Sequence, residues 1–202
     1  MNQIFRTKPY ILGLSIGTCW LIASSAGFSI QMIAIAGTSN DRTAIAAVVG
    51  VAAALLTVTL RQIVAARRLP NELPTPAHRG LRRRFVWVVI LELIGIVLVN
   101  SAFYSSGHMS LLVPFDLIIV GIHFFPLAKL FGVPRYTALG TSFCAISILT
   151  LLMVPADAHI GKAIARFLTS SVGCAVATWL TSVGNIAEVR RLLSRVARNA
   201  AR

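Results

Sequence analysis

The sequence is short of acidic residues and of charge in general. Only 6 of its 202 residues are Asp or Glu, and charged residues make up 12% of the chain, against about 25% in ordinary soluble domains. Hydrophobic residues make up 56%. A soluble globule of this length has too little interior to bury so much apolar surface, so an ordinary soluble fold is excluded.

Cysteine is also scarce. Cys19, Cys144 and Cys174 lie far apart inside apolar runs, so they form neither a disulfide framework nor a metal-binding spacing. We expect them to be small packing residues. The sequence likewise lacks the zinc-protease, serine-hydrolase, phosphate-loop and dinucleotide motifs. We therefore expect no metal and no cofactor, and an enzyme is the least favoured class.

Long apolar runs are what the chain has instead. About 20 residues at 1.5 Å each cross the ~30 Å of bilayer hydrocarbon. We predict an all-α integral membrane protein, a single domain over 1–202. Its six transmembrane helices are expected at about 10–37, 44–65, 85–104, 111–130, 136–154 and 162–187. The small residues at 23–26 also fit a signal-peptide cleavage site, but the apolar run continues past them, so a retained span is expected.

The basic residues predict how these helices are oriented. In a six-span topology, 16 of the 19 Lys and Arg lie on one side and three on the other. The 16 fall in the first nine residues, in 61–84, in 129–135 and in the tail 188–202. By the positive-inside rule both termini face the cytoplasm of a bacterial inner membrane. A pI of about 11.4 is also typical of nucleic-acid-binding proteins, but topology explains these flanking charges better, and no nucleic-acid partner is expected.

The longest connector, residues 67–84, is basic and contains prolines that discourage a continued helix. Its arginines are Arg67, Arg68, Arg79, Arg82, Arg83 and Arg84. We expect them to contact lipid headgroups, anionic ones in particular, at about 1 kcal/mol each; a purely topological role is the simpler alternative. The bilayer is thus the expected partner. A homo-oligomer or another membrane protein as partner is left open.

Four polar residues interrupt the third and fourth spans. At 1.5 Å per residue, Glu92 lies roughly 10 Å and His123 roughly 12 Å from the inner edge of the hydrocarbon. Asn100 and Asp116 each lie roughly 8 Å from the outer edge. Because the two spans form a hairpin, the matching depths predict a polar seam in which Glu92 faces His123 and Asn100 faces Asp116.

This seam has two interpretations. Ionisable groups inside a span are expensive and mark functional sites by default, so Glu92 and His123 are candidates for passing a proton or binding a cation. The alternative is a structural latch that fixes the register of the hairpin, in which each carboxylate has a hydrogen-bonding partner. The latch is the favoured interpretation from the sequence alone.

Pro126 follows His123 in the same span. A proline removes a backbone donor, so we predict a helix kink at Pro126 that leaves a carbonyl near Ile122 without its usual partner. The surrounding segment, Gly-Ile-His-Phe-Phe-Pro-Leu-Ala at 121–128, resembles a segment of small, uncharacterised bacterial multi-span membrane proteins. The resemblance covers about 15 residues and implies a bacterial integral membrane protein without implying an activity.

Small hydroxyl residues recur at helical spacing in the first and last spans. They are Ser15, Thr18, Ser25 and Ser29, and Ser171, Thr178 and Thr181. Small residues let helices approach closely in membranes, so helix packing is the expected role. A substrate path lined with hydroxyls is the alternative.

Transport or permeation of a small solute or ion is the leading expectation for function. It requires a water-accessible cavity that reaches Glu92. The alternative is a non-catalytic membrane scaffold or accessory subunit, for which we expect a dry, packed bundle with small-residue faces on the first or last span exposed to lipid.

Overall fold

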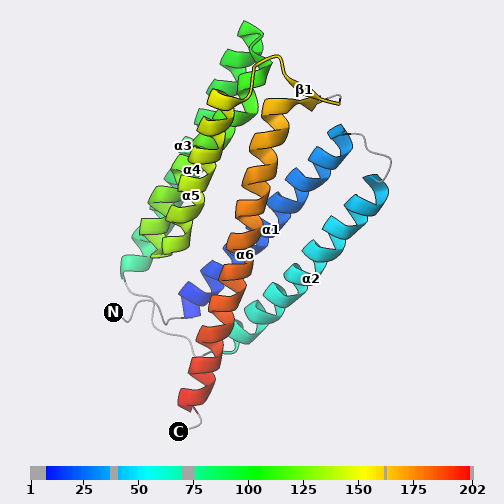
Figure 1. Cartoon of the computed structure of the whole chain (residues 1–202). Coiled ribbons are helices and arrows are strands. Elements are labelled where there is room, and N and C mark those ends of the chain that lie inside the picture. Colours follow the sequence, from blue (N-terminus) through cyan, green and yellow to red (C-terminus); the bar gives the residue numbers. More distant parts are fainter. Residues whose placement is uncertain (1–7, 37–40, 70–75, 162, 201–202) are drawn as a thin grey trace.

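The fold is a bundle of six long helices (Figure 1). A computed structural model of the chain describes residues 8–36, 41–69, 76–161 and 163–200. The helices are α1 (Lys8–Ala36), α2 (Asp41–Arg67), α3 (Pro76–Ser106), α4 (Met109–Phe131), α5 (Pro134–Met153) and α6 (Ala165–Ala200), and the strands are β1 (His159–Ile160) and β2 (Ala163–Ile164). All six helices are long and apolar enough to span a membrane. The predicted class, a helical multi-pass membrane protein, is confirmed.

Helix α6 joins two groups of helices. α1 packs with α2, while α4 packs between α3 and α5, and α6 contacts α1, α2, α4 and α5. Figure 1 shows α6 running between these groups and extending past them at its C-terminal end. With 36 residues, α6 is about 54 Å long, whereas the hydrocarbon is about 30 Å thick. Part of α6 therefore lies outside the hydrocarbon, and the basic residues of its last turns are the part that hydrocarbon would solvate least well.

Several helix boundaries differ from the prediction, and two of these differences change a connection between spans. The connector expected over 67–84 is helical from Pro76 onward, because a proline is tolerated in the first turn of a helix, where its missing N–H would have no partner. At the other boundary, α6 begins at Ala165 instead of residue 162. It follows a two-stranded antiparallel hairpin, β1–β2, which the sequence analysis did not predict.

The short turn between α4 and α5 follows from its residues. Gly132 ends α4 in the left-handed conformation, with φ 64°, and its N–H donates to the carbonyl of Ala128. Only glycine adopts this conformation readily, which makes it the common helix-ending residue. Pro134 then begins α5, so the chain reverses within a few residues and brings α4 and α5 together.

Two cations bind the ends of neighbouring helices. Lys8 Nζ donates to the carbonyls of Arg67 and Leu69 at 2.8 and 2.9 Å, tying the start of α1 to the end of α2. Arg166 donates to the carbonyls of Val154 and Leu151 at 2.8 and 3.1 Å, tying the start of α6 to the end of α5. Positive groups favour the C-terminal ends of helices because the last carbonyls there have no helical donor.

Candidate functional site

The α3–α4 hairpin positions the predicted seam. Aromatic pairs close it at both ends: the rings of Phe103 and Phe115 have centroids 5.0 Å apart near the turn, and those of Phe85 and Phe131 are 5.8 Å apart at the far end. The two pairs are centred on residues 108 and 109, at the turn and directly after it. An antiparallel helix pair of constant register brings residues together in this way, and the polar residues between the aromatic pairs follow the same register.

Glu92 and His123 lie face to face across this hairpin. Glu92 Oε1 is 3.1 Å from His123 Nδ1, and the two side chains are only 16% and 12% exposed. The expected pairing is therefore present. Desolvation makes an isolated charge costly inside a membrane, and each of these two groups lies within ion-pair distance of the other.

Two oxygens approach the same nitrogen of His123. Besides Glu92 Oε1, the carbonyl of Val120 lies 2.8 Å from Nδ1. A carbonyl oxygen only accepts hydrogen bonds, so this geometry assigns a proton to Nδ1 and makes it the donor. Among the described residues, Nε2 of His123 has no hydrogen-bond partner. The ring can therefore take up a second proton at Nε2 while Nδ1 continues to donate to the carbonyl of Val120.

Asn100 and Asp116 form the second polar contact of the seam. Asn100 Nδ2 lies 3.2 and 3.1 Å from the two carboxylate oxygens of Asp116 and also donates to the carbonyl of Ile96 at 2.9 Å. Asn100 is eight residues beyond Glu92 on α3, about 12 Å along the helix. The hairpin thus holds polar groups at two depths, as its sequence predicts.

Pro126 lies one turn beyond Ile122 on α4, which is helical on both sides of it. The proline therefore does not end the helix. Because it has no N–H, it cannot donate to the carbonyl of Ile122, which is the neighbour of His123 in the chain. The bend expected at Pro126 remains a prediction.

Most hydroxyl side chains of α1 and α6 donate a hydrogen bond to a backbone carbonyl of their own helix. Ser15, Thr18 and Ser25 are buried and donate to carbonyls four residues earlier in α1. Thr178 does the same in α6. Hydroxyls bonded to their own helix add no polar surface to the interface and leave room for close packing. This pattern fits the packing role better than a hydroxyl-lined path.

The sequence analysis missed a polar network where α1 begins and α6 ends. Arg135 of α5 forms an ion pair with Glu188 of α6, and the hydroxyl of Tyr10 donates to Glu188 at 3.3 Å. Glu188 is the one acidic residue of a strongly basic tail. That isolation was the available signal, because a lone acid among arginines commonly serves an ion pair.

Two buried carboxamides were missed as well. Gln62 of α2 donates to the carbonyl of Ile186 at 2.8 Å, but its own oxygen is buried with no hydrogen-bond partner among the residues that the structure describes. Asn185 of α6 is 0% exposed. Its side chain lies beside the Tyr136 hydroxyl, yet neither amide atom meets a partner in hydrogen-bonding geometry among the described residues. Both are polar carboxamides within apolar helical runs, the same sequence feature by which Asn100 was predicted to be a polar contact.

The connector arginines are placed only in part. Those whose side chains are described are all exposed, as a headgroup contact requires: Arg67, Arg68, Arg83 and Arg84. The side chains of Arg79 and Arg82 lie outside the described part of the structure. Headgroup contact therefore remains a prediction for all six.

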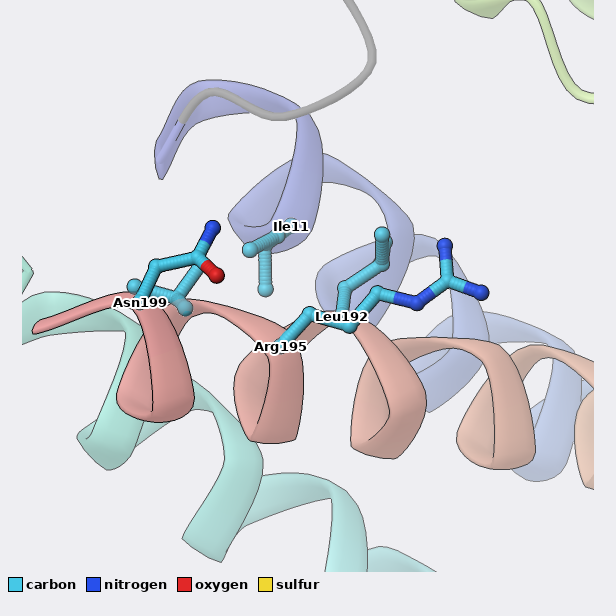
Figure 2. Close-up of a pocket in the computed structure, with 5 residues that line it drawn as sticks. Ile11, Leu192, Arg195 and Asn199 are labelled. Carbon is cyan, nitrogen blue, oxygen red and sulfur yellow. The ribbon is translucent and has the colours of Figure 1, made fainter. Parts of the chain in front are cut away.

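Among the grooves on the described part of the surface are two that are not lined by Glu92 or His123. One, of about 340 Å³, lies between α1 and the last turns of α6 (Figure 2). The other, of about 400 Å³, lies along α2 between Thr57 and Arg68. Comparison of the chain with protein families, curated proteins and solved structures found no match. What the chain does is therefore inferred from the chemistry of its own residues.

Proposed function

We propose that this protein moves a small solute or ion across the membrane and that the Glu92–His123 pair exchanges a proton during the cycle. The observation that carries the proposal is the contact of 3.1 Å between two ionisable side chains in facing spans. Charged groups are rare in spans because hydrocarbon solvates them poorly, and they usually mark ion or proton pathways. A proton that passes from a carboxylic acid to an adjacent imidazole leaves a carboxylate paired with an imidazolium, so the transfer creates no isolated charge.

Two further features support a path along the seam. Asp116 and Asn100 provide a second polar position nearer the α3–α4 turn. Pro126 frees the Ile122 carbonyl next to His123, and such a carbonyl is an acceptor for water or a cation. Together these groups supply polar atoms at several depths of one helix interface.

A scaffold or accessory subunit is the second candidate. The observation favouring it is that neither of the two surface grooves is lined by Glu92 or His123. In that case the four polar residues are latches that set the hairpin register. A latch needs no water access, whereas proton exchange does, so accessibility distinguishes the two functions.

We propose further that both termini lie in the cytoplasm and that the membrane is a bacterial inner membrane. The basic residues around the start of α1, in the α2–α3 connector, in the α4–α5 turn and in the last turns of α6 support this orientation, because cytoplasmic segments retain Lys and Arg. The start of α1, the end of α2, the start of α3, the α4–α5 turn and the last turns of α6 lie at the same end of the bundle (Figure 1).

Cysteine accessibility tests the proposal. In a variant with Cys19, Cys144 and Cys174 replaced by alanine, we expect Glu92→Cys and His123→Cys to react with a water-soluble thiol reagent. Ser106→Cys, exposed at the α3–α4 turn, is the positive control, and Ile22→Cys, at 0% exposure, is the negative one. If both test cysteines are as inert as the negative control in a folded protein, transport through the seam is wrong.

Proton flux provides the functional measurement. We expect proteoliposomes that contain the protein and an internal pH dye to acidify after an external acid pulse faster than empty vesicles. Glu92→Gln should lower this rate at least about tenfold, the scale of one lost proton-transfer group. Asp157→Asn, an exposed loop carboxylate, should leave the rate unchanged. Equal rates for the two variants would assign the flux to another route.

A further inference from the structure

The groove between α1 and α6 combines an apolar floor with a polar rim. Ile11, Leu192 and Val196 provide the floor, and Arg195 and Asn199 provide the rim. Figure 2 shows Ile11 on α1 opposite Leu192, Arg195 and Asn199, which come from successive turns of α6. Its volume is about 340 Å³. Such a lining fits an amphiphilic ligand better than a uniformly polar or uniformly apolar one.

The groove lies where the bundle leaves the hydrocarbon. Ile11 belongs to the first turns of α1, and the α6 residues of the lining belong to the last turns of a helix longer than the hydrocarbon is thick. Tyr10 of α1 lies in the same turn as Ile11, and tyrosine is enriched at membrane interfaces. A ligand here would have its polar part at headgroup level and its apolar part toward the bilayer.

The electrostatics around the groove favour an anion. Arg190, Arg191, Arg195 and Arg198 are all exposed on this part of α6. Glu188, the nearest acidic residue on α6, is already paired with Arg135, so it does not neutralise them. A second copy of this chain would bring a surface of the same charge and is disfavoured as the occupant.

We propose that this groove binds the headgroup of an anionic phospholipid. Arg195 donates a pair of hydrogen bonds to the phosphate, a geometry that suits a planar guanidinium, and the Asn199 amide donates to a neighbouring headgroup oxygen. Leu192 and Val196, which are partly exposed, contact the glycerol and the first acyl carbons. Basic recesses between helices at the cytoplasmic side of membranes are suited to such lipids. This site is separate from the seam and does not depend on the proposed transport.

Lipid retention tests the site. We expect native mass spectrometry of the detergent-solubilised full chain to show phosphatidylglycerol bound in preference to phosphatidylcholine. Arg195→Gln should weaken this binding at least about tenfold. Arg198→Gln, on the same helix but outside the lining, is the matched control and should weaken it by at most the fivefold that one surface charge of ~1 kcal/mol provides. Leu192→Trp should also weaken binding, because it fills the floor without changing the charge.

Several outcomes would overturn the proposal. Equal losses for the two arginine variants, with no effect of Leu192→Trp, would mean diffuse attraction to a basic surface. Competition by inorganic phosphate at the same concentration as the lipid would mean that the site binds free phosphate and that the acyl carbons contribute nothing to affinity. Release of the lipid by an acidic peptide at equal concentration would point to a protein partner. Helical circular dichroism of each variant confirms that the fold is intact.

Discussion

At the residue scale, a carboxylate oxygen of Glu92 and a ring nitrogen of His123 lie 3.1 Å apart in the α3–α4 hairpin. In water such a pair is worth little, because both groups are solvated when apart. Within a span, separation leaves each group in hydrocarbon, so the contact matters for stability whether or not it also carries protons. The two roles are compatible, since a group held in one geometry is also a well-placed proton donor.

A double-mutant cycle measures this contact. We expect Glu92→Ala and His123→Ala to show a coupling free energy of unfolding of about 1–2 kcal/mol, within the range for contacting polar residues. Glu92→Ala combined with Asp116→Ala is the control. Those residues lie at different depths and should be additive within about 0.5 kcal/mol. Additive behaviour of the first pair as well would show that the contact contributes nothing.

For Asn185 we predict that a substitution raises the free energy of unfolding instead of lowering it. Its amide is fully buried without a hydrogen-bonding partner among the described residues, and such a group destabilises by roughly 1–3 kcal/mol. Asn185→Leu, similar in volume, should therefore raise the free energy of unfolding by about 1 kcal/mol. Asn100→Leu, which removes the partner of Asp116, should lower it. Thermal unfolding in detergent compares the two, and a loss at Asn185 would reveal that its amide is satisfied in the folded protein.

At the element scale, the tightest contact joins α4 and α5 through two glycines. A Cβ added to Gly140 would lie 2.5 Å from the carbonyl oxygen of Gly121, and a Cβ added to Gly121 would lie 3.0 Å from the carbonyl oxygen of Gly140. The backbones touch because neither residue has a side chain, a packing mode common between membrane helices. This contact holds α4, and thereby the seam, against the rest of the bundle.

Gly140→Ala should therefore be strongly destabilising. Since the backbone of Gly121 cannot yield without moving α4, we expect a loss of about 1–3 kcal/mol, the usual cost of overpacking. Gly50→Ala on α2, where an added Cβ meets nothing within 4 Å, should be neutral or gain up to about 1 kcal/mol from helix propensity. Unfolding in a graded denaturing detergent compares them, and equal effects would refute the close contact.

The helices and their contacts differ in how far they could be predicted from the sequence. The six spans and the Glu92–His123 contact were predictable, because hydrocarbon thickness fixes helix length and a short turn fixes the register of a hairpin. The Arg135–Glu188 pair was not, because α5 and α6 are connected through the unpredicted β1–β2 hairpin, so no short turn fixed their register in advance. The early start of α3 was missed because its prolines were interpreted as breakers when one of them begins a helix.

At the scale of the whole molecule, the orientation in the membrane can be measured directly. In the cysteine-free background, Ser106→Cys at the α3–α4 turn should react with a membrane-impermeant maleimide on intact cells. Ser194→Cys on the last turns of α6 should react only after permeabilisation, because the basic end is expected inside. Both side chains are exposed, so a difference reports the side of the membrane. The reverse pattern would invert the topology.

Helix α3 has one more consequence, for the synthesis of the chain. None of the 18 residues in its most apolar window is buried, and its polar groups Glu92 and Asn100 find their cross-helix partners on α4. A nascent chain that released α3 into lipid first would expose a carboxylate, at about 3 kcal/mol for a charge near the centre of a span, until His123 emerged from the ribosome. We therefore expect the translocon to release α3 and α4 into the bilayer together, as one hairpin. The polar residues of the seam are then already in contact when the hairpin enters the lipid.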